Sequence, residues 1–160
     1  MDRPTELIAQ LRLIEHPEGG YYSEVFRSAA AVQPEDGRGS RPALTSIYFL
    51  LPGDAVSRWH RVRSDEIWHF YDGAPLDLWL LPPEGNLPDR HRLGPLDGDS
   101  QPTVAVPAGW WQAARSTGEY TLVGCTVGPG FEFQDFTMAR DQEKVAATFR
   151  SGGGILADLL

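Results

Sequence analysis

Hydrophobic and polar residues alternate in short runs along the middle of the chain, and the runs are separated by glycine, proline and acidic residues. Alternation with a period of two is typical of β-strands that bury one face. The intervening Gly- and Pro-rich stretches are typical of turns. The pattern predicts strands over residues 21–27, 44–51, 56–62, from 66 onward, 75–81, 90–93, 101–106, 112–116, 120–127 and 131–138.

Helical spacing occurs only near the two ends. Leu7, Ile8 and Leu11 fall on one face of a helix over residues 4–13, and residues 141–149 also have helical character. Gly152–Gly154 predicts a flexible break, and the polar residues 29–42 predict a mobile loop. Many short strands between terminal helices, with no internal repeat, favour an all-β jelly roll with short terminal helices.

Composition narrows the class of partner. The 160 residues suit one domain, residues 1–160, and the 14 basic and 22 acidic residues give a net charge of −8. This charge disfavours nucleic-acid and anionic-membrane partners, which need clustered Lys and Arg. No apolar run approaches bilayer length, and the single cysteine, Cys125, indicates a buried thiol in a reducing compartment. We therefore expect a cytoplasmic protein.

Polar residues that could bind a ligand or take part in catalysis concentrate between Gly53 and Gly73. Counting by twos places Arg58, His60 and Val62 on one strand face, and places a second set on the face of the next strand. That second set comprises Glu66, Trp68 and Phe70. If these faces point into a barrel, it holds an imidazole, a carboxylate and aromatic walls, which suit a small organic molecule.

This stretch resembles the first sequence motif of the cupin superfamily. The motif has a glycine, two histidines one residue apart, a glutamate and a closing glycine, and Gly53, His60, Glu66 and Gly73 match it. Val62 stands at the second histidine position, and the interval from Gly53 to His60 is one residue longer than usual. The second cupin motif resembles residues 107–112, where Gln112 stands at the usual metal-binding histidine.

The chain also resembles one cupin subfamily of mostly uncharacterised proteins, sometimes labelled predicted sugar epimerases. The match covers roughly residues 7–140. It implies a cupin double-stranded β-helix with a core at about 19–140, and a homodimer. The resemblance is carried by Gly19-Gly20-Tyr21-Tyr22, Thr45-Ser46-Ile47-Tyr48, Ser64-Asp65-Glu66-Ile67-Trp68 and Gly124-Cys125-Thr126-Val127-Gly128-Pro129-Gly130-Phe131.

A metal site is one interpretation of these residues. By analogy with the family's ligand positions, His60, Glu66 and Gln112 are the set that a divalent metal would use. Val62 offers no donor and an amide is a poor ligand, so we expect no cofactor. The alternative is a purely structural role, in which His60 and Glu66 hydrogen-bond to each other in a polar pocket.

Acid–base chemistry without a metal is the leading hypothesis. Cupin-fold sugar epimerases use a histidine base and a tyrosine acid, which suggests His60 as base, Glu66 as its partner and Tyr48 as acid. The predicted ligand contacts are Trp68, Phe70, Gln112 and Arg58. Two other functions remain open: a non-catalytic metabolite-binding protein, and a metal-dependent enzyme such as a dioxygenase.

The remaining aromatic residues and histidines are predicted to lie elsewhere. Trp59 and His69 alternate away from the pocket face and are expected at a sheet or subunit interface. His16 and His91 lie beside turns or on polar strands and are expected at the surface.

Overall fold

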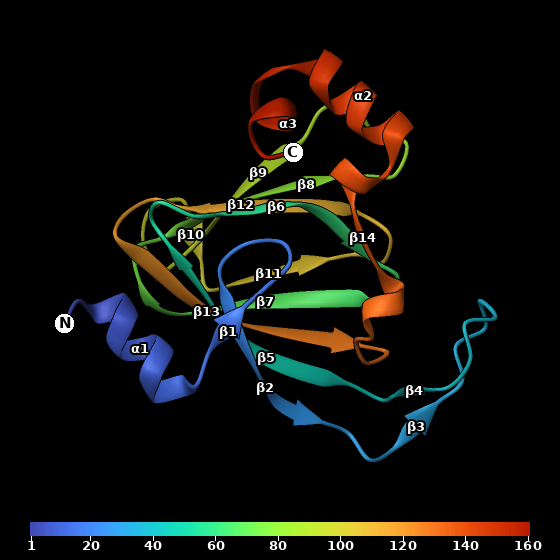
Figure 1. Ribbon diagram of the computed structural model, residues 1–160, viewed down its shortest axis with the longest axis horizontal. Coiled ribbons are helices and arrows are strands. Elements are labelled where there is room, and N and C mark those ends of the chain that lie inside the picture. The colour runs from blue at the N-terminus through green and yellow to red at the C-terminus, as the bar shows by residue number, and fades with distance from the viewer.

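The structure, a computed structural model, describes residues 1–160 and places two six-stranded sheets face to face (Figure 1). The first sheet has the order β1 (Ile14–Glu15), β2 (Tyr21–Arg27), β5 (Thr45–Pro52), β13 (Tyr120–Gly128), β7 (Asp65–Gly73) and β11 (Thr103–Val106). The second has the order β10 (Ser100–Gln101), β9 (Asp89–Leu93), β8 (Leu76–Leu81), β12 (Trp111–Ser116), β6 (Val56–Val62) and β14 (Phe136–Met138). This is the predicted jelly roll.

Most predicted strands form within one or two residues of the expected bounds, but the segment 131–138 differs. Only its last three residues, β14, pair with β6, and the 3₁₀ turn η1 (Phe133–Asp135) precedes them. The rings of Phe131 and Phe133 lie edge to face with centroids 5.0 Å apart. Packing these rings on each other favours a turn over an extended strand here.

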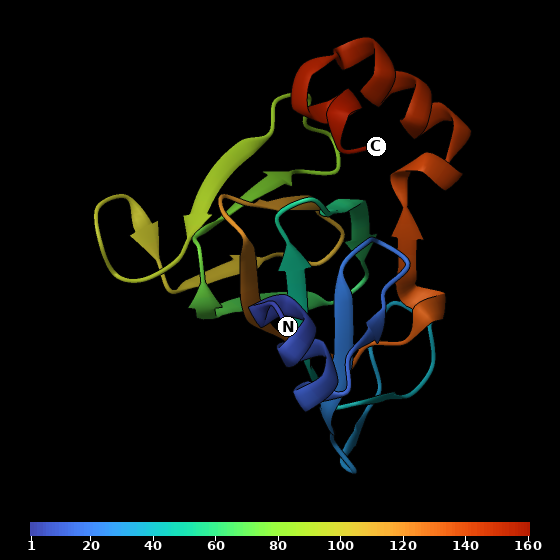
Figure 2. The same cartoon turned by 60° about the vertical axis from the view of Figure 1, so that its left-hand side comes forward.

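The helices cover the outside of the two sheets. Helix α1 (Arg3–Leu11) begins with the Asp2 side chain capping the Thr5 amide at 2.9 Å, and it buries Leu7 against the first sheet. After the 3₁₀ turn η2 (Ala139–Asp141), helices α2 (Glu143–Gly152) and α3 (Gly154–Asp158) cover the second sheet (Figure 2). None of the helices is long and apolar enough to cross a membrane.

Two expectations, the flexible break at Gly152–Gly154 and the interface position of Trp59, need correction. Gly153, with φ +64°, connects α2 directly to α3, so the glycines mark a tight helix–helix turn. Leu156 and Leu159 of the apolar tail are buried. Trp59, expected at an interface, is fully buried beneath these helices and donates its indole N–H to the Ile155 carbonyl at 3.1 Å.

The polar segment 29–42 folds back as a hairpin of β3 (Ala31–Val32) and β4 (Arg41–Pro42). Asp135 of η1 accepts hydrogen bonds from Arg41 at 2.8 and 2.9 Å and from Arg38 at 3.4 Å. The Arg41 guanidinium lowers the pKa of Asp135. Charge-assisted bonds to a buried carboxylate anchor this segment, in contrast to the mobile loop that composition predicts.

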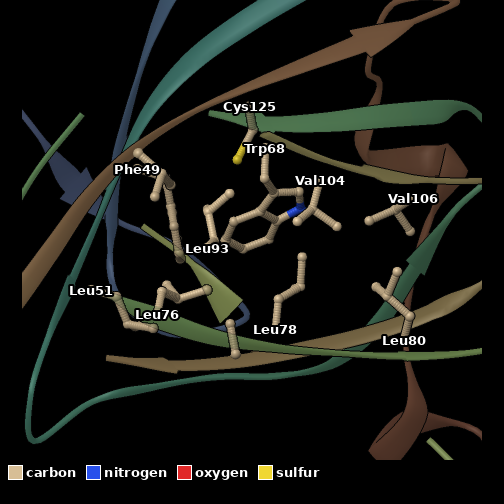
Figure 3. Close-up of a cluster of buried hydrophobic side chains, with 12 residues drawn as sticks. Phe49, Leu51, Trp68, Leu76, Leu78, Leu80, Leu93, Val104, Val106 and Cys125 are labelled. Carbon is tan, nitrogen blue, oxygen red and sulfur yellow. The ribbon is translucent and has the colours of Figure 1, made fainter. Parts of the chain in front are cut away.

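The interior of the barrel has two ends of different character. One end is closed by a dry cluster in which Trp68 lies among Phe49, Leu93 and Val104 (Figure 3). Leucines from β8 complete it, and all are almost fully buried. The other end, beyond Phe49 and Cys125, is hollow and holds the candidate site.

Candidate functional site

A cavity of about 440 Å³ lies between the two sheets. Its walls are largely aromatic, with Tyr22, Phe49, Phe131, Phe133 and Phe136 among the lining residues. Its buried polar side chains include two histidines and two glutamates, His16, Glu18, His60 and Glu66. A cavity of this size with a few converging polar groups suits a small organic ligand.

His60 and Val62 both line the cavity, and a β-bulge in β6 brings Ser57 inward as well. Along β12 the register moves two residues, from Gln112 to Ala114, while along β6 it moves three, from His60 to Ser57. The extra residue resets the alternation, so Ser57 and His60 both face inward. The bulge accommodates the additional residue between Gly53 and His60 that the sequence motif shows.

The same bulge corrects the prediction for Arg58. This residue was expected on the His60 face, as a ligand contact. Its Nη1 instead donates to the Leu160 carbonyl at 3.0 Å, and it does not line the cavity.

A turn between β1 and β2 supplies a carboxylate that the sequence interpretation missed. Glu18 accepts the Ser57 hydroxyl at 2.8 Å through Oε1, and its Oε2 lies 3.1 Å from His60 Nε2. Gly19 and Gly20 have φ of +109° and +71°, which favours glycine at both positions. The Gly-Gly pair in the subfamily-like segment was the available signal, because it places the preceding residue in a tight inward turn.

His16 is also inside the cavity, contrary to the predicted surface position. It is buried beside Tyr22, with ring centroids 4.7 Å apart, and its Nδ1 accepts the Glu18 amide at 3.2 Å. Burial lowers the pKa of His16. His91 is exposed as predicted.

The contact between His60 and Glu18 requires a shared proton. His60 Nδ1 lies 2.7 Å from the Arg58 carbonyl oxygen, so this nitrogen carries a hydrogen and donates it. The Nε2 lone pair of a neutral ring then faces a carboxylate oxygen, and two acceptors at this distance need a hydrogen between them. Burial lowers the pKa of His60 and raises the pKa of Glu18. Both shifts favour the uncharged forms of the two groups, a neutral imidazole and a protonated carboxyl.

Glu66 forms a second polar chain at the back of the cavity. Gln112 Nε2 donates to Glu66 Oε1 at 2.8 Å, and Trp68 Nε1 donates to Gln112 Oε1, also at 2.8 Å. Burial raises the pKa of Glu66 to about 7, against the opposing effects of His60 and the Gln112 hydrogen bond. Glu66 is therefore close to half-protonated at neutral pH, and its predicted hydrogen bond to His60 is replaced by one to Gln112.

The predicted metal ligands fit a divalent ion poorly. An indole N–H can only donate, so the Gln112 oxygen must face Trp68 and its amide hydrogens must face Glu66. Those hydrogens would point toward a cation at the Glu66 carboxylate. No three His, Cys, Asp or Glu side chains are grouped so as to hold a metal ion. Val62 lines the cavity as an apolar wall.

Four other predicted site residues lie outside the cavity lining, and one of them, the predicted ligand contact Gln112, is separated from the cavity by its hydrogen bond to Glu66. Tyr48 is on the outer face of β5, near the residues that pack against α1, because Ile47 and Phe49 take the inward positions. It therefore cannot serve as the acid in this cavity. Trp68 does share the Glu66 face but is buried in the dry cluster, and Phe70 packs against that cluster. Cys125 is a buried thiol, as predicted, whose pKa burial raises well above its usual value.

Charged residues surround the open end of the cavity. Arg27 donates to Glu24 at 3.0 and 2.9 Å, and to Glu132 at 3.0 Å. Arg12 and Ile14 also line this end and are exposed. The site thus passes from a charged entrance, through aromatic walls, to the buried His60–Glu18 pair and Glu66.

Relatives of this chain share its fold over nearly its whole length. Protein SO0799 from Shewanella oneidensis is 34% identical, with a TM-score of 0.85, covering 99% of this chain and 98% of that one. A hypothetical protein from Leishmania major is 31% identical, with a TM-score of 0.79, covering 92% and 96%. The uncharacterized protein YML079W of Saccharomyces cerevisiae is 27% identical over 156 residues, which is 88% of this chain and 77% of the yeast protein.

The family model described as Cupin superfamily (DUF985) matches residues 5–139, a range that includes both barrel ends and every residue of the His60–Glu18 and Glu66 clusters. The protein therefore belongs to this family of the cupin superfamily.

Proposed function

We propose that this protein is a metal-independent isomerase or epimerase that moves a proton at the carbon next to a carbonyl of a small, sugar-like molecule. One observation carries the proposal: the His60–Glu18 pair and Glu66, whose pKa is about 7, line the same aromatic cavity. Groups that titrate near the working pH are the most effective general acids and bases. Paired titratable groups in a closed pocket are also typical of functional sites.

In the proposed reaction the His60–Glu18 pair is the base. As the substrate C–H bond breaks, its proton passes to Glu18 Oε2, while the proton already held there passes to His60 Nε2. Protonated Glu66 gives its proton to the carbonyl oxygen, so that an enediol forms between an imidazolium and a carboxylate. The His60–Glu18 pair then returns a proton to carbon. If it goes to the neighbouring carbon, Glu66 takes the hydroxyl proton of the carbon that lost its hydrogen, which completes an isomerisation. If it goes to the other face of the same carbon, Glu66 takes back the proton that it gave, which completes an epimerisation.

This assignment keeps His60 from the sequence hypothesis and changes its partners. Glu18 replaces Glu66 as the group bonded to the imidazole. Glu66 replaces Tyr48 as the acid, because Tyr48 lies outside the cavity lining. Charge stays balanced throughout, which matters because an uncompensated buried charge is unfavourable by several kcal/mol.

The test is hydrogen exchange in D₂O. The protein is incubated with dihydroxyacetone, D-glyceraldehyde, D-erythrose and D-fructose, and with their phosphate esters, and deuterium incorporation next to the carbonyl is followed by NMR. We expect exchange above the buffer rate for at least one sugar, with most of it lost in Glu18→Gln. Exchange at the buffer rate with every sugar, or equal rates in wild type and Glu18→Gln, contradicts the proposal.

A non-catalytic metabolite-binding protein is the second candidate. It is favoured by the fact that both His60 nitrogens already have partners, at 2.7 and 3.1 Å. Native mass spectrometry of the purified protein distinguishes the two functions. A bound metabolite recovered unchanged, together with no exchange in D₂O, supports binding alone.

We also propose that two copies pair through the outer face of the first sheet. Ile67 and Tyr71 on β7 are 40% and 51% exposed there, and Tyr71 packs near Tyr48, with ring centroids 6.1 Å apart. Apolar side chains gathered on a sheet face suit a symmetric dimer. Light scattering after gel filtration should give twice the chain mass, and Ile67→Asp should reduce it to one chain.

A further inference from the structure

Arg12 occupies a backbone position that normally belongs to glycine. It directly follows α1 with φ of +54°, and it is the one non-glycine residue with positive φ. The Leu13 amide donates to the Ile8 carbonyl at 2.9 Å, and the Arg12 amide donates to the Ala9 carbonyl at 3.4 Å. This is the helix-ending arrangement in which glycine is favoured, because a side chain is strained there.

The side chain at this position belongs to the open end of the cavity. Arg12 and Arg27 are the two cations among the lining residues. Arg27 is neutralised by Glu24 and Glu132, at 2.9 and 3.0 Å. Arg12 is exposed and has no acidic side chain within the 4.0 Å that defines an ion pair.

What distinguishes Arg12 from the other cations without an ion pair is its position in the cavity lining. The chain carries a net charge of −8, yet the cavity opens beside an unpaired guanidinium. A guanidinium binds carboxylate and phosphate groups through two parallel hydrogen bonds, and more strongly than it binds neutral groups. Strained backbone positions cluster at ligand-binding and active sites, so a non-glycine residue at this φ points to a use for its side chain.

We propose that Arg12 binds the oxyanion of the ligand, a carboxylate or a phosphate, while the body of the ligand lies between the aromatic walls. This names the substrate class for the proposed proton transfer, namely a small anionic carbonyl compound, and to that extent it rests on the proposed function. Binding can be measured without turnover, so the two proposals can fail separately.

The test uses two dyes that differ in charge. The sulfonate dye 1-anilinonaphthalene-8-sulfonate and its neutral analogue N-phenyl-1-naphthylamine are titrated by fluorescence. We expect the anionic dye to bind at least about tenfold more tightly, and Arg12→Gly to weaken it by roughly tenfold or more while changing the neutral dye less than about twofold. Arg12→Lys should give an intermediate loss, because it keeps the charge without the planar fork.

Stability separates this result from misfolding. Because glycine relieves the strain at φ +54°, Arg12→Gly should keep or raise the melting temperature, by about 2–4 °C. Arg115→Gln is the matched control, since Arg115 is exposed on β12, lies outside the cavity lining and has no ion pair. It removes one positive charge and should leave both dye affinities unchanged.

Competition against the anionic dye identifies the kind of oxyanion. Stronger displacement by 1-naphthyl phosphate indicates a phosphate ligand, and stronger displacement by 1-naphthylacetate indicates a carboxylate. Equal affinity for the two dyes, unchanged binding in Arg12→Gly, or equal displacement by neutral 1-naphthylmethanol overturns the proposal. Absence of deuterium exchange contradicts the proposed reaction and leaves the dye result standing.

Discussion

The two ends of the barrel interior are built by the same strands and have opposite properties. On β7, Trp68 lies in the dry cluster and Glu66, two residues earlier, lies in the cavity. On β5, Leu51 belongs to the cluster and Ile47 to the cavity. Each of these strands therefore has one part in the closely packed cluster and another part at the cavity, which contains the titratable groups.

The two ends have different roles in the same barrel, one in stability and one in the proposed proton transfer. Burying apolar side chains in the dry cluster stabilises the fold, by about 1.5–3 kcal/mol for each large side chain. The cavity end lowers the stability of the fold, because Glu18 and Glu66 are buried carboxyls whose pKa values burial raises. Such groups reduce stability at neutral pH, and they are the groups on which proton transfer depends.

The largest expected effect is a loss of exchange activity after a substitution at the cavity end of the barrel. Glu18→Gln keeps the size of the side chain but removes the proton shared with His60, so deuterium exchange should fall by about 10²–10⁴-fold. The melting temperature should change little, because the amide can still hydrogen-bond to Ser57 and His60. His60→Ala should lose as much exchange, and a wild-type rate in either variant rejects the pair as the base.

The matching change at the dry end should act on stability alone. Leu78 is fully buried in the cluster, and Leu78→Ala should lower the free energy of unfolding by about 2–5 kcal/mol. Val127→Ala, at the cavity wall, should lower it by about 1 kcal/mol, because the lost methyl groups already face open space. Urea denaturation measures both, and equal losses would contradict the division between the ends.

Titration of Glu66 should link stability to pH. Burial raises its pKa from the usual 4.5 to about 7 in the folded protein, so the folded state binds the extra proton between these values. The stability that this proton provides is complete below pH 4.5 and is lost as the pH rises through 7, by at most about 3 kcal/mol.

Glu66→Gln should remove that dependence. Relative to wild type, the variant should gain stability between pH 4 and pH 8, as measured by urea denaturation at each pH. Its exchange rate should also fall, because an amide cannot donate the acid proton. A stability difference that is the same at both pH values would show that Glu66 titrates normally.

The smallest effect tests the turn that carries Glu18. A Cβ at Gly19 would overlap the Val56 carbonyl oxygen, and φ is +109° there. Gly19→Ala should destabilise the protein by about 1–3 kcal/mol and reduce exchange, since the turn must move away from β6. Gly37→Ala, also at positive φ but with open space around it, is the control and should leave exchange unchanged.

Local sequence patterns predict the fold and two of the cavity residues, His60 and Glu66. Alternating apolar positions and Gly- and Pro-rich turns predict strands such as β2 and β6 at their observed bounds, because side chains alternate between the two faces of any strand. The same counting placed Glu66 on an inward face. It also identified His60 as the central imidazole.

Tertiary structure decided the partners of these residues. A bulge in β6, visible only through its pairing with β12, turned Arg58 away and brought in Ser57. Glu18 reaches His60 across 42 residues of sequence. No local pattern encodes such a contact, because it depends on how a turn between two strands of one sheet packs against the other.

The orientation of Gln112 and the exclusion of Tyr48 have the same origin. The indole of Trp68 fixes which side of the amide faces Glu66. Tyr48 faces outward because its strand buries Ile47 and Phe49 instead. Periodicity specifies that the faces of a strand differ, while the choice of buried face and the pairing of polar groups within it depend on long-range packing, which only the folded chain defines.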